Sequence, residues 1–162
     1  MTRKRTKPRK LKNIIVTTDL SAHSLAALEM ATSLADQYHA TLSILYVADE
    51  SPPPMIGLDS PQGREFQKHI RKRARALLTD FVASGMKGRT SVRRVVRVGD
   101  PPRAINRFAA GKPGSVVVMA THGHTGLAHV LLGSVTEQVV RTSSVPVVTV
   151  KPKRFLRAKR RK

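Results

Sequence analysis

Five short runs of β-branched and aliphatic residues alternate along the chain with longer segments of helical periodicity, and this alternation limits the fold most strongly. The apolar runs are 13–18, 41–47, 91–98, 115–120 and 145–150. Between them, apolar side chains recur every three or four residues, as on the buried face of a helix. The two longest stripes are Leu25, Leu28, Ala31, Ala35 and Tyr38, and then Phe66, Ile70, Ala74, Leu77 and Phe81. Strands that alternate with helices predict a parallel sheet with helices on both faces.

Two further helices are predicted from their first residues. Asp100 before Pro101 is typical of an N-cap followed by proline in the first turn, and predicts a short helix through Ala110. The segment 134–137 matches the S-x-x-E capping box and predicts a helix to Arg141. The connection Ala48–Gly63 contains three consecutive prolines, so we expect a long loop that can close over a ligand.

Length and composition indicate a single domain with an aliphatic core. The chain has 162 residues, of which 40% are hydrophobic and 4% aromatic, with no tryptophan. The absence of cysteine excludes a disulfide scaffold, a thiolate zinc site and a cysteine nucleophile. No apolar run approaches the roughly 20 residues of a membrane span, and the basic N-terminus lacks the apolar stretch of a signal peptide. We therefore expect a cytoplasmic protein without a membrane span.

The residues that follow the predicted strands are candidates for a binding site, because ligands of such sheets bind beyond the carboxyl ends of the strands. Asp19 follows the first strand, Val47–Ala48 the second and Gly99–Asp100 the third. The fourth strand leads into a glycine-rich loop, 120–134, that ends at the start of a helix. Glycines let backbone amides approach an anion closely, and a helix N-terminus adds unpaired donors. The segment is equally compatible with a phosphate cradle and with a mobile loop before an ordinary helix cap.

Three segments resemble the universal stress protein family. They are 13–21 (NIIVTTDLS), 119–137 (MATHGHTGLAHVLLGSVTE) and 145–148 (VPVV), and the resemblance extends over residues 13–151. It implies a three-layer α/β fold, an open parallel five-stranded sheet of order 3-2-1-4-5 with helices on both faces. This fold is Rossmann-like and is similar to that of the adenine nucleotide alpha hydrolases. The resemblance also implies a homodimer that pairs through the last strand.

The family has an ATP-binding branch with a glycine motif, namely Gly, two residues, Gly, nine residues, Gly, and Ser or Thr. Gly123, Gly133 and Ser134 match this motif, whereas Ala120 stands where the first glycine belongs. Thr17 replaces a proline that is usual in the family. Alanine at 120 weakens the match if that position needs a positive φ or direct contact with the ribose. The implied cofactor is ATP, with Mg²⁺ or Mn²⁺ as its ion.

The resemblance assigns the nucleotide to the ends of the first, second and fourth strands. The Val47 backbone would contact adenine, and Asp19 would lie near the nucleotide as a metal ligand or simply cap the next helix. The implied binding residues are Thr17, Thr18, Asp19, Val47, Met119, Ala120, His122, Gly123, Gly126, Gly133, Ser134, Val135 and Thr136. No catalytic residue is predicted, because no nucleophile is paired with a general base and the cradle contains no lysine or arginine. We therefore expect slow ATP hydrolysis at most.

Three histidines of the same loop raise a zinc alternative. They are His122, His124 and His129. Their loop contains no cysteine and no nearby acid, so the spacing is more typical of residues that flank a phosphate than of a zinc site.

Positive charge is concentrated at the two ends of the chain. Of 30 lysines and arginines, residues 1–12 contain seven and residues 151–162 contain eight, without any acid. Such like-charged segments predict basic disordered arms at 1–12 and 152–162 around a domain at 13–151. Inside the domain, a basic stripe lies opposite an apolar helical face, which is typical of a solvated surface. The stripe is Lys68, Arg71, Lys72 and Arg75.

These observations leave two main functional hypotheses. In the first, the chain is an ATP-binding regulatory module of the stress response. In the second, it is a dimeric scaffold whose arms bind nucleic acid or an anionic membrane surface without nucleotide. Base-specific recognition by the arms is poorly supported, because Phe155 is their one aromatic residue. A true ATPase or kinase is a third, weaker hypothesis.

Overall fold

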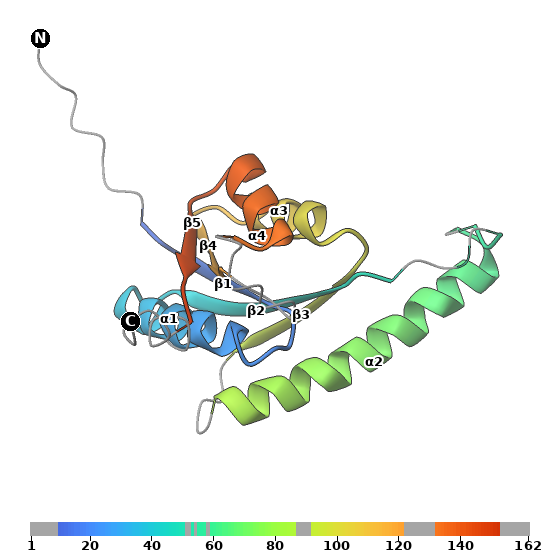
Figure 1. Cartoon of the computed structure of the whole chain (residues 1–162), viewed down its shortest axis with the longest axis horizontal. Coiled ribbons are helices and arrows are strands. Elements are labelled where there is room, and N and C mark those ends of the chain that lie inside the picture. Colours follow the sequence, from blue (N-terminus) through green and yellow to red (C-terminus); the bar gives the residue numbers. More distant parts are fainter. Residues whose placement is uncertain are drawn as a thin grey trace, which may run out of the picture.

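The computed structural model describes residues 10–50, 53, 55–57, 59–86, 92–121 and 132–152. Within these residues, five strands and four helices alternate in the predicted order (Figure 1). The strands are β1 (Asn13–Thr18), β2 (Thr41–Ala48), β3 (Arg93–Val98), β4 (Ser115–Ala120) and β5 (Val147–Val150). The helices are α1 (Ser24–Gln37), α2 (Pro61–Gly85), α3 (Pro101–Ala110) and α4 (Ser134–Thr142). All strand pairs are parallel and their order is β3-β2-β1-β4-β5, which confirms the fold that the resemblance implied.

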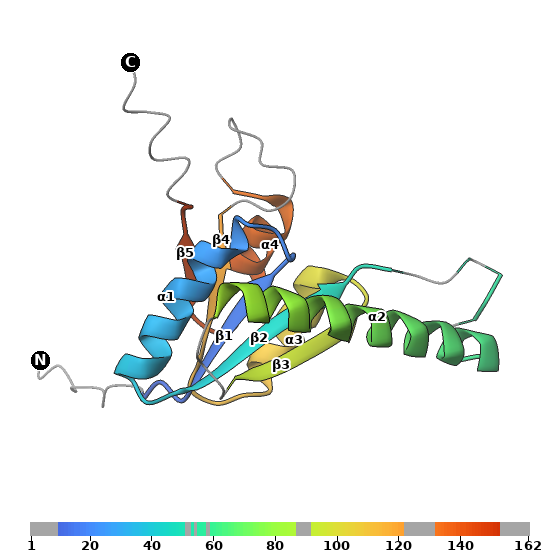
Figure 2. The same ribbon diagram turned by 90° about the horizontal axis from the view of Figure 1, so that it is seen from below.

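The sheet is the middle of three layers. Helices α1 and α2 lie on one face and α3 and α4 on the other, as Figures 1 and 2 show. Ile14 and Val16 of β1 pack in the core beneath α1 and α2, whereas Ile15 packs in the core beneath α3 and α4. All three side chains are at most 1% exposed. The central strands are therefore apolar at successive positions because both of their faces are covered.

The last strand begins later than its sequence predicted. We expected a strand over 145–150, but β5 begins at Val147. Val145 is held in a turn instead, because its N–H donates to Ser143 Oγ at 3.2 Å and its carbonyl accepts from the same hydroxyl at 3.0 Å. Pro146 has no N–H to offer, although its carbonyl accepts from Val117 of β4 at 3.0 Å. β5 is an edge strand of the sheet.

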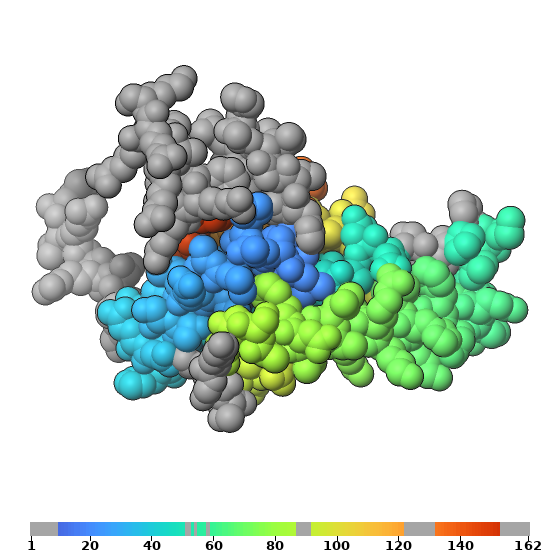
Figure 3. Space-filling view, turned by 60° about the horizontal axis from the view of Figure 1, so that its bottom comes forward, coloured from blue at the N-terminus to red at the C-terminus, as the bar shows by residue number. Residues whose placement is uncertain are grey.

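Helix α2 is longer than predicted, and its N-terminal part projects beyond the sheet (Figures 1 and 2) and forms one end of the molecule in the space-filling view (Figure 3). It begins at Pro61, because the Ser60 side chain accepts a hydrogen bond from Gly63 N at 3.0 Å and proline occupies the first turn. The buried face contains Leu78, which is 0% exposed, whereas Leu77 is 44% exposed. The predicted stripe was wrong at this position, since a repeat of 3.6 residues carries the buried face from position 74 to 78. No helix among the described residues is long and apolar enough to cross a membrane.

Two other local predictions differ from the structure. Gly133, not Ser134, is the N-cap of α4, and no side chain accepts a capping hydrogen bond there. Leu11 and Lys12, which we expected in the N-terminal arm, contact the folded domain. Leu11 packs against the core, and Lys12 N donates to Gly114 O at 2.9 Å. Pro152, which we expected in the C-terminal arm, is buried, whereas Lys10 is exposed. The rest of the predicted arms, 1–9 and 153–162, lies outside the described residues.

The two adjacent leucines of α2 provide a matched test of this packing. Leu78→Ala should lower the free energy of unfolding by about 2–5 kcal/mol, because it leaves a cavity in a closed core. Leu77→Ala removes the same atoms from an exposed position and should cost less than about 1 kcal/mol. Urea denaturation of both variants measures the difference. Equal losses would contradict the observed orientation of α2.

Candidate functional site

A cavity of about 300 Å³ opens where the carboxyl ends of β1, β2 and β4 meet the starts of α3 and α4. This volume is at the lower end of the range typical of small-molecule pockets. The lining residues are Thr17, Thr18, Asp19, Ser24, Leu45, Val47, Pro101, Ile105, Met119, Ala120, Gly133, Ser134, Val135 and Thr136. They include every described residue of the predicted site. His122, Gly123 and Gly126 lie outside the described residues.

The side of the cavity formed by β2 and α3 is apolar. Leu45 and Val47 are two residues apart on β2 and therefore point to the same face of the sheet. Pro101 and Ile105 face them from α3, one helical turn apart. Ile105 is 2% exposed and belongs to the core beneath α3 and α4. This side can bury a flat apolar group, and none of its four residues is charged.

The side of the cavity formed by the end of β1 and the start of α1 is polar. Leu20 N donates to Thr18 Oγ1 at 2.8 Å, Thr18 Oγ1 lies 2.7 Å from Ser24 Oγ, and Ser24 Oγ donates to Ser21 O at 2.7 Å. Since each hydroxyl has one hydrogen, the Thr18 hydroxyl must donate to Ser24. These bonds hold the β1–α1 turn, in which Leu20 has a left-handed backbone with φ of 67°. A left-handed backbone is unfavourable for leucine, and the hydrogen bonds of the Thr18 and Ser24 hydroxyls hold the turn in this conformation.

Asp19 lies at the rim of this polar side. Its Oδ1 accepts from Ser21 N at 3.1 Å and from Ser21 Oγ at 2.6 Å, which fixes the carboxylate at the end of β1. Among the described residues, no group of three acids or histidines could hold a metal ion. The described lining residues include one carboxylate, that of Asp19. A phosphate-bound Mg²⁺ commonly takes one or two protein carboxylates and otherwise phosphate and water oxygens.

The first turn of α4 lines the cavity. Gly133 N donates to Thr121 O at 2.8 Å, and Gly133 O accepts the first helical bond from Glu137 N at 2.9 Å. Thr136 Oγ1 donates to Ala120 O at 3.0 Å and ties the helix to the end of β4. Residues 134–136 are the first turn, whose N–H groups have no partner within the helix. Aligned peptide dipoles make this end of the helix attractive to an anion.

Ala120 fits its position without strain. It is the last residue of β4 and pairs with Val150 of β5. Among the described residues other than glycine, only Leu20 and His39 have a positive φ. The backbone of position 120 therefore does not require glycine, and the departure from the family motif has no conformational cost.

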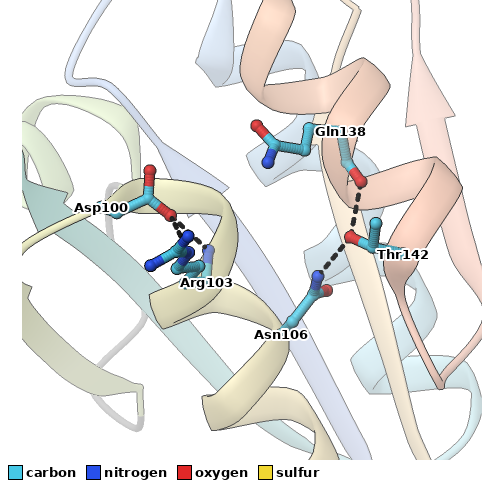
Figure 4. A network of polar contacts seen from close by, with 5 residues as sticks. All are labelled: Asp100, Arg103, Asn106, Gln138 and Thr142. Carbon is cyan, nitrogen blue, oxygen red and sulfur yellow. Dashed lines mark hydrogen bonds and ion pairs between the residues drawn. The ribbon is translucent and has the colours of Figure 1, made fainter.

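The two helical walls of the cavity are joined by polar contacts (Figure 4). Asn106 Nδ2 on α3 donates to Thr142 Oγ1 on α4 at 2.8 Å, and Thr142 Oγ1 donates to Gln138 O at 2.7 Å. At the start of α3, Asp100 Oδ1 accepts from Arg103 N at 3.0 Å, which confirms the predicted N-cap. The hydrogen bond between Asn106 and Thr142 thus joins α3 to α4 outside the cavity.

Four lining residues escaped the sequence analysis, namely Ser24, Leu45, Pro101 and Ile105. Leu45 could have been found from Val47, because residues two apart on a strand share a face. Pro101 and Ile105 were assigned to a helix, but only the packing of α3 across the sheet brings them to the cavity. The described part of the loop between β2 and α2 contributes no lining residue, so the structure gives no support to a lid there.

Charged groups gather on the other face of β2 from the cavity. Tyr46 is half-buried, and burial raises the pKa of its phenol, with a further rise from the Glu50 and Asp19 carboxylates. Arg73 of α2 opposes this rise and also forms an ion pair with Glu50. The carboxyl end of β2 is therefore connected to α2 through this pair.

Comparison with known proteins places the chain in a family. The profile of the Universal stress protein family matches residues 10–151. The chain belongs to the universal stress protein family. Universal stress protein MJ0531 of Methanocaldococcus jannaschii is 33% identical over 152 residues, covering 86% of this chain and 82% of that protein.

Solved universal stress proteins have the same fold. Universal stress protein UspA from Lactobacillus plantarum has a TM-score of 0.68 at 26% identity, covering 89% of this chain and 99% of that chain. A universal stress protein in complex with cAMP has a TM-score of 0.53 at 27% identity, covering 86% of this chain and 95% of that chain. Similar members of the family therefore include a protein that binds an adenine nucleotide.

The raised pKa of Tyr46 predicts a loss of stability in alkaline solution. Since the folded protein holds this proton more tightly than the unfolded chain, the free energy of unfolding should fall as pH rises above about 10. Tyr46→Phe should lack this component. Phenolate absorbance of Tyr38→Phe, which leaves Tyr46 as the single tyrosine, should report ionisation above the ordinary value of 10.0. Ionisation of Tyr46 at or below that value would contradict the observed environment.

Proposed function

We propose that this universal stress protein is a regulatory module that binds ATP in the cavity at the carboxyl ends of β1, β2 and β4. The proposal rests on one observation, namely that the described residues of the binding site implied by the family resemblance lie together in this cavity. Ten residues distributed over 17–136 of the sequence all line one cavity. A similar family member in complex with cAMP supports an adenine nucleotide as the class of ligand.

The difference in polarity between the two sides of the cavity suggests how the nucleotide would be oriented. Adenine is flat and largely apolar on its faces, so we place it between β2 and α3, against Val47 and Ile105. The triphosphate would extend toward the first turn of α4, where backbone amides and the hydroxyls of Ser134 and Thr136 can donate to it. Asp19 would hold the phosphate-bound Mg²⁺ or Mn²⁺, which balances phosphate charge when bound.

The same chemistry argues for binding rather than rapid turnover. No described lining residue is a lysine, an arginine or a histidine. Efficient phosphoryl transfer needs positive charge at the transferred group and a residue that positions the nucleophile. We therefore infer slow hydrolysis at most and a role in which ATP occupancy sets the state of the protein. Pairing of two copies through the edge strand β5 is part of this proposal.

Gly133 offers the sharpest test of the phosphate end. Gly133 has φ of −64° and ψ of 152°, and among the described residues an added Cβ would meet only Thr121 O, at 3.6 Å, which is ordinary van der Waals contact. Aspartate and asparagine are equally good N-caps, but only aspartate adds a negative charge beside the phosphates. Gly133→Asp should weaken ATP binding by at least about tenfold through like-charge repulsion, whereas Gly133→Asn should retain it. Isothermal titration calorimetry at physiological salt measures both.

The arms provide the control for nonspecific attraction of a polyanion. Removal of 1–9 and 153–162 should leave ATP affinity nearly intact if the cavity binds the nucleotide. Equal affinities of the two Gly133 variants, or loss of ATP binding with the arms, would overturn the proposal in favour of the scaffold hypothesis.

A further inference from the structure

A second hollow borders a neighbouring face of α3, about a quarter of a turn around the helix from the residues that line the cavity. It is a surface groove of about 420 Å³ between α3 and the end of β3. The lining residues are Arg97, Val98, Ala104, Arg107, Phe108, Gly111 and Lys112. Three of these side chains are cationic and none is acidic. The nucleotide cavity uses Pro101 and Ile105 of the same helix, so the two sites share α3 but no residue.

Two of the three cations of the groove contact one aromatic ring. The Arg97 guanidinium carbon lies 5.3 Å from the centroid of Phe108, and Lys112 Nζ lies 5.1 Å from it. Arg97 Nη1 also donates to Val96 O at 3.0 Å. Cation–π contacts of this kind are worth about 0.5–1 kcal/mol at exposed sites. Two positive charges are therefore positioned before any partner binds, which reduces the entropy lost on binding.

The basic surface continues beyond the groove. β3 is the outermost strand of the sheet, and Arg93 lies on the same face of it as Arg97 because the two are four residues apart on a strand. On α3, Arg103 lies one turn before Arg107. Asp100, the N-cap between β3 and α3, is the one acid from Arg93 to Lys112, and its Oδ1 lies 3.8 Å from Arg103 Nε. This surface therefore contains five cationic side chains and one carboxylate.

The shape and chemistry of this surface select one class of partner. Arginine guanidinium groups donate paired hydrogen bonds that match phosphate oxygens. A stacking platform for single-stranded bases is missing, since Arg97 and Lys112 already contact Phe108. The exposed large apolar side chains among the described residues are Met30, Tyr38, Met55, Leu77 and Val140, and none is on β3 or α3. Among the described residues, β3 and α3 therefore offer no large exposed apolar side chain that could enter a membrane beside the groove.

We propose that the groove between β3 and α3 binds the phosphate backbone of double-stranded DNA without sequence preference. Duplex DNA carries about one negative charge per 1.7 Å of its axis, so several phosphates can meet the five cations at once. This proposal concerns the folded domain, and it stands apart from both ATP binding and the basic arms.

The test compares two triple variants of the full chain that have the same net charge. The groove variant is Arg97→Gln, Arg107→Gln and Lys112→Gln. The control variant is Arg71→Gln, Lys72→Gln and Arg75→Gln, which removes three exposed cations from α2. Fluorescence anisotropy with a mixed-sequence DNA duplex gives the affinity of each protein between about 50 and 200 mM salt.

The groove variant should bind the duplex at least about tenfold more weakly than the control variant. Log affinity falls with log salt, and each lost phosphate contact reduces the steepness of this fall by about 0.9. The slope of the groove variant should therefore be less steep by about 2 to 3. The control should change its slope by less than about 1. Circular dichroism and thermal denaturation show that both variants fold, and ATP calorimetry should give the same affinity for both, which separates this result from the proposed function.

Several results would overturn the proposal. Equal losses in the two variants would assign DNA binding to net charge or to the arms. Tighter binding of single-stranded than of duplex DNA would exclude a backbone clamp. Loss of binding to phosphatidylserine vesicles in the groove variant, with duplex binding intact, would assign the groove to anionic lipid. Absence of duplex binding by the unmodified chain would also refute it.

Discussion

The reversal of strand order between β1 and β4 is the constraint on which the rest of the structure depends. Crossover connections between parallel strands are right-handed, so helices that lead in opposite directions along the sheet must cover opposite faces. The chain runs outward from β1 to β3 with α1 and α2 on one face, then returns to β4 and β5 with α3 and α4 on the other (Figure 1). The connections diverge beside β1, and the cavity opens there.

The divergence of the connections beside β1 leaves a hollow, and the polar groups around the turn after β1 make this hollow a candidate binding site. The left-handed backbone at Leu20 turns the chain sharply after β1, and the hydroxyls of Thr18 and Ser24 satisfy the backbone groups of that turn. The polar end of the cavity thus contains fixed dipoles and one acid, Asp19. In the function we propose, oriented amides rather than lysine or arginine would bind the phosphates, which favours retention of the nucleotide over its cleavage.

Periodicity was sufficient to predict every strand and helix in order, because each element has a buried face of its own. Boundaries were less predictable where a single hydrogen bond decides them, as with Ser60 at α2 and Ser143 before β5. The described site residues were found through the family motif and the rule for strand ends. Ile105 was missed because its position depends on how α3 crosses the sheet, which local sequence does not encode.

A crystal structure grown with excess ATP tests the central claim most directly. We expect adenine between Val47 and Ile105 and phosphate oxygens within hydrogen-bond distance of the first amides of α4. An empty cavity, or ATP bound elsewhere on the surface with the cavity closed by side chains, would contradict the assignment of this hollow to a nucleotide.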